Sequence, residues 1–172
     1  MNNVDSSLRV TPSPVNPWLA LAGWIVLCAM AGAVGAIASA EAKEFYATLE
    51  QPSWAPPAAV FGPVWTLLYI AMAVAAWLVW RERGWEPARV ALRLFMLQLA
   101  LNALWSWLFF AWHLGGLALV DILVLLALIV ATLAAFARIR RLAAWLLVPY
   151  LAWVGFATAL NYSVWQRNPL LQ

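Results

Sequence analysis

Five nearly uninterrupted apolar stretches, each about as long as a membrane-crossing helix, constrain this chain more than any other feature of its sequence. They cover residues 17–40, 58–80, 88–112, 114–137 and 142–166. A helix needs about twenty apolar residues to cross a hydrocarbon core that is about 30 Å thick. The strands of a membrane barrel would instead alternate in polarity over about ten residues. The sequence therefore predicts an all-α protein, an integral membrane bundle of five transmembrane helices.

The composition of the chain also requires a lipid environment. Of the 172 residues, 66% are hydrophobic and 10% are charged, whereas soluble domains are about 45–50% apolar and about 25% charged. A water-soluble fold of this length has too little interior for so much apolar surface, so membrane lipid must cover part of it. The net charge of +3 is too small to indicate a nucleic-acid partner.

A single transmembrane domain accounts for most of the chain. Residues 1–16 are polar, and we interpret them as a flexible N-terminal tail. Residues 17–168 form the predicted five-helix domain, and residues 169–172 form a C-terminal tail. The first apolar stretch is longer than the roughly 7–15 apolar residues of a signal peptide. We therefore expect it to be retained as a helix.

The connection at residues 41–57 is the longest between two apolar stretches. It contains Phe45, Tyr46 and Trp54, and three prolines stiffen its C-terminal part. Long loops in compact proteins are usually functional or disordered, and this one is too aromatic for a plain spacer. We expect it to fold over the helix bundle as a lid.

Lysine and arginine are divided unequally between the two sides of the membrane. Eight of the ten lie in the N-terminal tail, and in the second and fourth connections with their adjoining helical turns, and the other side holds Lys43 and Arg167. The positive-inside rule then places the N-terminus in the cytoplasm, and the lid and C-terminus outside. Helices of this hydrophobicity stop in the inner membrane during export, so a bacterial inner membrane is the expected location.

Three sequence segments, in this order, carry a resemblance to a known family. The first is Pro52–Pro57 followed by Phe61–Trp65, the second is Leu101–Ser106, and the third is Val148–Trp153 followed by Phe156–Tyr162. Together they resemble the tryptophan-rich sensory protein/translocator protein family (TspO/MBR). The resemblance covers nearly all of the predicted transmembrane domain, and the five-helix plan of that family agrees with the apolar stretches.

The resemblance implies a function and a partner. Members of the family bind tetrapyrroles such as protoporphyrin IX, and they bind sterols and drug-like apolar ligands, in a pocket that the first loop closes. The family typically forms homodimers, and some bacterial members are reported to degrade porphyrin in light. The lid commonly carries a tryptophan before its tyrosine. Here the pair is Phe45-Tyr46, and phenylalanine lacks the indole N–H donor.

Helical spacing places several aromatic and amide side chains on common faces, because residues three or four apart share one side of a helix. The candidate ligand-binding residues are Phe45, Tyr46 and Trp54 in the lid; Phe61, Trp65 and Leu68 in the second stretch; Gln98, Asn102, Trp105 and Phe109 in the third; and Pro149, Trp153, Ala157 and Leu160 in the fifth. If these faces meet, they form an aromatic slot suited to a flat, mostly apolar macrocycle.

Several polar residues have a structural interpretation beside the functional one. Asn102 and Asn161 can simply bond neighbouring helices. Asp121 is the sole acid inside an apolar stretch, where acids are candidates for function, but it lies within about two turns of the helix start, where water can reach it. His113 is at a helix end, where a surface position is the usual one and axial ligation of a metalloporphyrin the less usual. Leu160, Tyr162 and Arg167 match a cholesterol pattern that is weak.

Small residues repeat at every fourth position of the first apolar stretch. The two stripes are Ala31, Gly35 and Ser39, and Gly32, Ala36 and Ala40. Small residues let helices approach closely, so the stripes can serve packing within the chain or a homodimer. The sequence alone leaves both uses open.

The sequence supports three functions in descending order. The first is a sensory or regulatory membrane protein that binds a tetrapyrrole as its ligand and needs no obligatory cofactor or metal. The alternative is a light-dependent porphyrin-degrading enzyme, in which Trp65 or Trp153 gives an electron to the excited porphyrin. A tetrapyrrole transporter is third, because the apolar stretches contain almost no charge and no inverted repeat.

Overall fold

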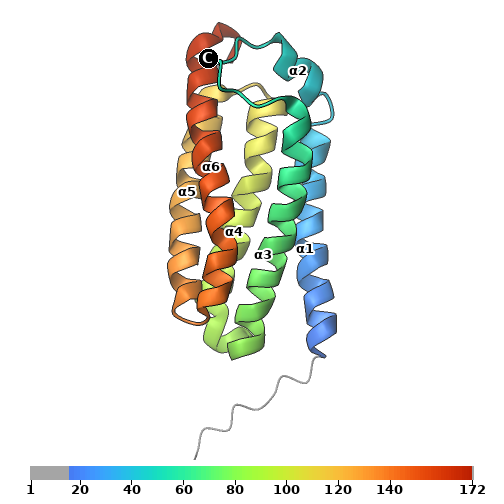
Figure 1. Ribbon diagram of the computed structural model, residues 1–172, viewed down its shortest axis with the longest axis vertical. Coiled ribbons are helices and arrows are strands. Elements are labelled where there is room, and N and C mark those ends of the chain that lie inside the picture. The colour runs from blue at the N-terminus through green and yellow to red at the C-terminus, as the bar shows by residue number, and fades with distance from the viewer. Residues whose placement is uncertain (1–15, 172) are drawn as a thin grey trace, which may run out of the picture.

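Five long helices stand side by side in the computed structural model, which describes residues 16–171 (Figure 1). The long helices are α1 (Pro17–Ala38), α3 (Phe61–Arg83), α4 (Trp85–Ser106), α5 (Gly115–Ala137) and α6 (Arg141–Arg167). Each of them is long and apolar enough to cross a membrane. The predicted all-α membrane bundle with five spanning helices is therefore confirmed.

Four short elements complete the described chain. They are the lid helix α2 (Ala42–Thr48), a 3-10 turn at Ala58–Val60, a π-helical turn at Trp107–Ala111 and a 3-10 turn at Pro169–Leu171. The predicted C-terminal tail is ordered up to this last turn, in which Leu171 is buried. Of the predicted N-terminal tail, all but Asn16 lies outside the described residues. The Asn16 side chain accepts a hydrogen bond from the Trp18 amide and begins α1.

The ends of the helices differ from the predicted ones where local chemistry decides them. The sequence predicts a connection of several residues between α3 and α4, but only Gly84 separates these helices. Gly84 has a φ of 73°, in the left-handed region that glycine adopts without steric cost. Pro87 lies in the first turn of α4, where its missing N–H would have no partner within the helix.

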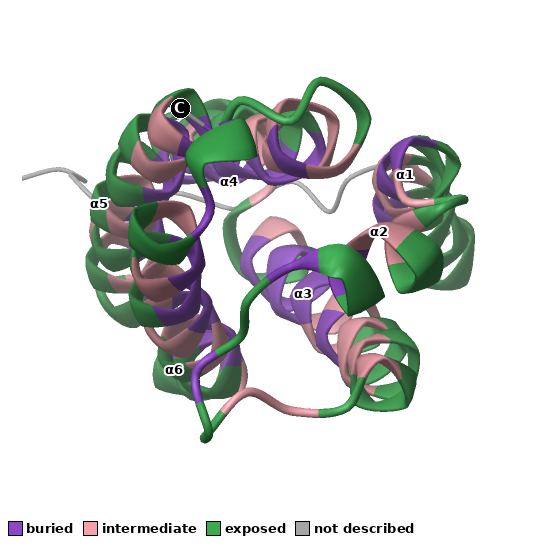
Figure 2. Cartoon of the chain, turned by 90° about the horizontal axis from the view of Figure 1, so that it is seen from above, coloured by how far each residue is buried: buried purple, intermediate pink, exposed green. Residues whose placement is uncertain are grey.

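The buried faces of the helices point toward one another (Figure 2). α1 packs against α3 and α4, while α5 packs against α4 and α6, and α3 contacts α6. Phe95 of α4 is fully buried near the middle of this arrangement. Its ring stacks on Phe136 of α5, with centroids 5.9 Å apart, and meets the edge of Trp24 of α1 at 5.9 Å. One α4 side chain thus joins three helices.

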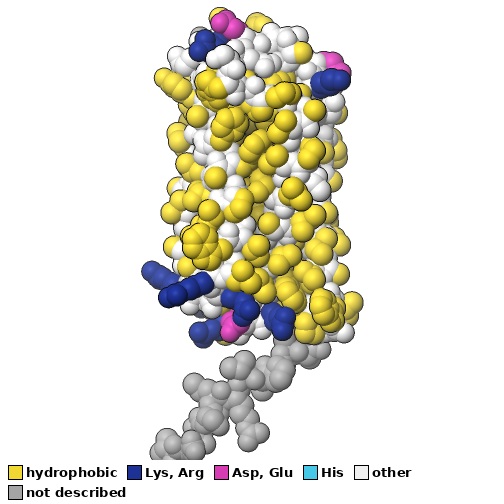
Figure 3. All heavy atoms as spheres, in the orientation of Figure 1, with side chains coloured by type: hydrophobic (Ala, Val, Ile, Leu, Met, Phe, Trp, Pro, Cys, Tyr) yellow, Lys and Arg dark blue, Asp and Glu magenta, His cyan; other side chains and the backbone are white. Residues whose placement is uncertain are grey.

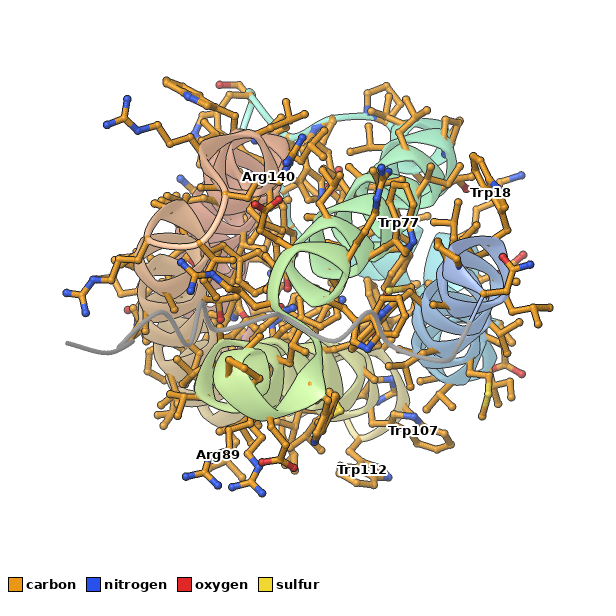
Figure 4. All side chains as sticks on the ribbon, turned by 90° about the horizontal axis from the view of Figure 1, so that it is seen from below. Trp18, Trp77, Arg89, Trp107, Trp112 and Arg140 are labelled. Carbon is orange, nitrogen blue, oxygen red and sulfur yellow. The ribbon has the colours of Figure 1, made fainter. Side chains whose placement is uncertain are left out.

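Arginines gather at the end of the bundle opposite the lid, and the surface between the two ends is largely hydrophobic (Figure 3). At that end Arg140 bonds Glu82 at 2.8 Å and so joins the start of α6 to α3. Trp77 of α3 stacks on Trp18 of α1, with centroids 6.1 Å apart (Figure 4). The Trp77 indole also donates to the Pro17 carbonyl at 2.9 Å. These contacts fasten the beginning of α1 to the bundle.

Candidate ligand-binding site

A cavity of about 620 Å³ lies between α1, α3, α4 and α6, beneath the lid helix α2. Small-molecule sites in proteins are usually about 300–1,000 Å³ and mostly apolar with a few placed polar groups. Seven of the residues that the sequence nominated line this cavity, and they come from four helices. These are Tyr46, Phe61, Trp65, Asn102, Trp105, Trp153 and Ala157.

Tryptophans from three helices form the aromatic part of the wall. Trp65 comes from α3, Trp105 from α4 and Trp153 from α6. Trp65 lies against the ring of Tyr69 at 5.6 Å, and Trp153 meets the edge of Phe61 at 5.8 Å. The three indoles therefore line one space although each is at least 40 residues from the next in the chain.

Hydrogen bonds hold parts of this wall in place. The Trp105 indole donates to the Asn161 side-chain oxygen at 3.0 Å, and the Asn161 amide donates to the Gly115 carbonyl at 3.1 Å. Asn161 therefore has the structural role that the sequence left open. The Asn102 amide lines the cavity and donates to the Tyr69 hydroxyl at 2.8 Å. Among the described residues, the buried indole nitrogen of Trp153 has no hydrogen-bond partner.

Two of the nominated residues line another space than the cavity, the buried Leu68 and the exposed Pro149. Leu68 and Pro149 line a separate shallow apolar groove between α3 and α6. Trp153 lines this groove as well as the cavity. Helical spacing places Leu68 near the face of Trp65, and Pro149 near the face of Trp153. The rotation of α3 and α6 about their axes nevertheless leaves Leu68 and Pro149 outside the cavity wall. Trp153 thus forms a wall between the two spaces.

Gln98, Phe109 and Leu160 do not line the cavity either. Gln98 accepts a hydrogen bond from the Tyr150 hydroxyl at 2.7 Å, in a fully buried position between α4 and α6. Phe109 stacks on Trp105, with centroids 5.2 Å apart. Leu160 is buried in the same small core as Phe109. These residues support the wall instead of contacting the space that it encloses.

Only one of the three nominated lid aromatics lines the cavity. Tyr46 is buried and meets the edge of Phe61 at 5.7 Å. Phe45 instead stacks on His113, with centroids 4.1 Å apart, and Trp54 meets the edge of Phe156 at 5.6 Å. His113 and Trp54 belong to the packing of the lid on the bundle. Neither lines the cavity.

A side-chain clip closes the lid against the end of α6. The Asn168 side-chain oxygen Oδ1 accepts from the Glu50 backbone N–H at 2.8 Å, and the Asn168 side-chain Nδ2 donates to the Glu50 backbone carbonyl at 3.1 Å. Arg167 lies 3.9 Å from the Glu50 carboxylate. Asn168 is buried, so the paired bonds are protected from water and hold the lid backbone in one register.

The first helix supplies a wall of the cavity that the sequence did not nominate. Gly32, Gly35 and Ala36 of α1, and Ser39 directly after it, line the space. A Cβ atom on Gly32 would lie 3.0 Å from the Tyr69 ring. The small-residue stripes were the sequence feature that could have identified this wall. The sequence alone left two uses open for them, packing within the chain and a homodimer. In the structure their residues permit the close approach of α1 to α3 and α4 beside the cavity.

The other nominated positions lie apart from the cavity. Asp121 is buried on α5, and one of its carboxylate oxygens has no partner among the described residues, but it lines neither the cavity nor the groove. In the cholesterol pattern, Leu160 is buried whereas Tyr162 is exposed. Leu160 and Tyr162 therefore do not present one continuous surface.

Comparisons with known proteins agree with this architecture. The TspO/MBR family pattern matches residues 24–166. The chain is 44% identical over 155 residues to the human translocator protein, covering 88% of this chain and 92% of that protein. It is 44% identical over 154 residues to the tryptophan-rich protein TspO of Chlorobaculum tepidum, covering 88% and 97%. It is 41% identical over 151 residues to protein CrtK of Rhodobacter capsulatus, covering 85% and 91%.

These matches extend through all the helices that enclose the cavity. Identity above 40% over most of both chains agrees with the order of motifs and with the five spanning helices. This chain belongs to the TspO/MBR family.

Proposed function

We propose that this protein binds a tetrapyrrole of the protoporphyrin IX type in the cavity beneath its lid. The observation that carries the proposal is the convergence of Trp65, Trp105 and Trp153 from three helices on one cavity. Aromatic faces on several sides suit a flat ring better than they suit a lipid tail. Binding in this place would couple the ligand to the position of the lid.

The chemistry of the wall favours a planar and mostly apolar ligand. Each offset aromatic stack contributes about 0.5–1.5 kcal/mol beyond burial, so two or three indoles can orient a macrocycle. Within this wall the Asn102 side-chain amide donates a hydrogen bond to the Tyr69 hydroxyl at 2.8 Å. Their remaining hydrogen-bonding capacity can fix the register of pyrrole nitrogens or ring substituents. Sterol-like and drug-like apolar ligands would use the same surface.

The proposed setting is a bacterial inner membrane. The arginines at the end opposite the lid (Figure 3) support a cytoplasmic position for that end, because positive residues are enriched on the cytoplasmic side. The lid would then open to the outer side. We also propose a homodimer as the working assembly, as the family resemblance implies. Its interface would lie on the exposed apolar helix faces, away from the cavity.

A direct titration tests the binding proposal. Protoporphyrin IX added in the dark to the detergent-purified protein is expected to quench tryptophan fluorescence saturably, at one ligand per chain, because three indoles would contact the ring. Oleate at the same concentrations is the control for detergent-like partitioning, and it should leave the fluorescence nearly unchanged. Quenching that rises linearly without saturation, or equally with oleate, would contradict a specific site.

The structure also favours a second candidate function, a light-dependent oxidation of the bound porphyrin. Trp65 and Trp153 line the cavity wall, and Trp65 lies 5.6 Å from Tyr69 and 6.2 Å from Tyr150. In this candidate, dioxygen is the oxidant and adds both of its atoms to the macrocycle, which is oxidised. The electron that an indole lends to the excited porphyrin returns to it, so the protein is unchanged at the end.

Illumination of the complex separates binding from this chemistry. If the protein acts as an enzyme, the visible porphyrin spectrum is expected to fade in light and air several times faster with the wild type than with Trp65→Phe. Phenylalanine keeps the aromatic surface but is much harder to oxidise than indole. The measurement is the bleaching rate at equal ligand occupancy, with samples under argon as the oxygen control. Equal rates for wild type, Trp65→Phe and free porphyrin would leave binding as the only function.

A further inference from the structure

We propose that Lys43, on the lid helix α2, pairs with a carboxylate of the ligand in the cavity. The inference rests on the proposed tetrapyrrole site, whose protoporphyrin IX ligand carries carboxylates, and it names the residue that recognises them. It also assigns an orientation, with the acid group toward the lid and the apolar edge of the ring toward the membrane interior.

Lys43 is the charged group that the cavity offers. It lies on the lid helix α2 and lines the cavity, and the other described lining residues are uncharged. It is also exposed, so both water and a ligand in the cavity can reach this residue. None of the salt bridges among the described residues uses Lys43. A cation with no acid partner on the wall of an otherwise uncharged cavity is complementary to an anionic ligand group.

Tyr46 supplies a second donor beside the lysine. It follows Lys43 by three residues, so both lie on the same face of α2, and both line the cavity. Tyr46 is 7% exposed, and its hydroxyl has no hydrogen-bond partner among the described residues. Burial raises the pKa of the Tyr46 phenol, so the hydroxyl stays protonated at neutral pH. An unpartnered buried hydroxyl is costly unless a ligand group accepts from it.

The distribution of polarity along the cavity sets the orientation of the ligand. Lys43 and Tyr46 lie at the lid end, whereas Ile25, Cys28 and Ala73 line the part farther along α1 and α3. The Asn102–Tyr69 pair between these ends is already bonded internally. A carboxylate pushed into the apolar end would lose its hydration without a cation to replace it. The acid group therefore faces the lid.

Comparing a free acid with its ester tests the inference. Protoporphyrin IX and its dimethyl ester have the same ring, but only the free acid carries carboxylates. We expect the wild type to bind the acid about three- to tenfold more tightly than the ester, the range for an ion pair partly open to water. In Lys43→Met this preference should disappear through a loss of acid affinity, with ester affinity unchanged. Lys43→Arg, which keeps the charge, should retain most of it.

A matched variant controls for the overall charge of the lid. Thr48→Glu changes the net charge by the same amount as Lys43→Met, on the same helix, at an exposed residue that does not line the cavity. Thr48 is five residues from Lys43, so the new carboxylate is not on the face where residues three or four apart pair. Thr48→Glu should preserve the preference for the acid. If Thr48→Glu removes the preference as completely as Lys43→Met does, then general electrostatic attraction explains it, and direct pairing with Lys43 is contradicted.

The lysine can also be observed directly, because Lys43 is the sole lysine of the chain. Reductive methylation with ¹³C-formaldehyde keeps its charge and places one lysine signal in the ¹³C spectrum beside that of the N-terminal amine, and the Lys43→Met sample identifies it. Protoporphyrin IX should shift this signal saturably, and the dimethyl ester should shift it much less. Equal shifts with both ligands would overturn the assignment of the carboxylate to Lys43.

The outcomes distinguish this inference from the proposed function. Equal and saturable binding of acid and ester by both wild type and Lys43→Met would contradict the lysine pairing and leave the tetrapyrrole site intact. Binding of neither ligand would contradict the site itself, and the inference with it. A selective loss of acid binding in Lys43→Met alone supports both.

Discussion

Trp153→Ala is expected to weaken protoporphyrin IX binding roughly 30-fold, or about 2 kcal/mol at 1.4 kcal/mol per tenfold change. The indole contributes one aromatic face of the proposed site. It also separates the cavity from the outer groove between α3 and α6, because it lines both. Alanine would remove the stacking partner and open the cavity toward lipid at the same point. The dark fluorescence titration, or absorbance of the bound porphyrin, measures the loss.

The control for this prediction is another tryptophan of the same helix. Trp145 of α6 is 69% exposed and far from the lid, so Trp145→Ala should leave the affinity within about twofold. Thermal unfolding of both variants shows whether the fold is kept. A Trp153→Ala protein that is folded and binds as tightly as the wild type would exclude Trp153 from the site.

Phe95→Ala is expected to lower the free energy of unfolding by about 3 kcal/mol, the largest loss of stability that we predict. The side chain is fully buried and contacts Trp24 and Phe136 on two other helices. In soluble proteins such truncations cost about 3–5 kcal/mol. Lipid is as apolar as the core, so the transfer part is reduced here, while the lost packing contacts remain. We therefore expect a value at the low end of that range.

Reversible unfolding in mixed detergent micelles measures this change. Leu97→Ala on the same helix is the matched control, since Leu97 is 51% exposed on the bundle surface and faces lipid in the proposed setting. Its replacement should change the stability by less than about 1 kcal/mol. If both variants lose the same stability, the packing of α4 against α1 and α5 does not depend on Phe95 as the structure indicates.

The aromatic residues of the lid make two kinds of contact, with the cavity and with the helix bundle. Tyr46 lines the space, whereas Phe45 and Trp54 rest on His113 and Phe156. The Asn168 clip then holds the distal part of the lid through two bonds to the Glu50 backbone. A ligand acid group at Lys43 would add a further contact between lid and cavity. Ligand occupancy and lid closure would in this way stabilise each other.

The sequence by itself determined the class of the fold, because lipid imposes a rule that can be read residue by residue. A spanning helix must be about twenty residues long and apolar, and each of the five stretches meets this rule. The sequence did not determine where α3 ends and α4 begins. The sequence could not show that Gly84 alone would separate them with a φ of 73°, because a turn of several residues satisfies the same pattern.

Only the tertiary structure decided which side chains face the cavity. Helical spacing put Trp65 with Leu68, and Trp153 with Pro149, but the rotation of each helix depends on packing against its neighbours. With the observed rotation Leu68 and Pro149 line the groove between α3 and α6, whereas Trp65 lines the cavity and Trp153 lines both spaces. The α1 wall was hidden for a related reason. A stripe of small residues such as Gly32 and Ala36 indicates that another helix packs closely against α1. Which helix this is depends on contacts between residues far apart in the chain.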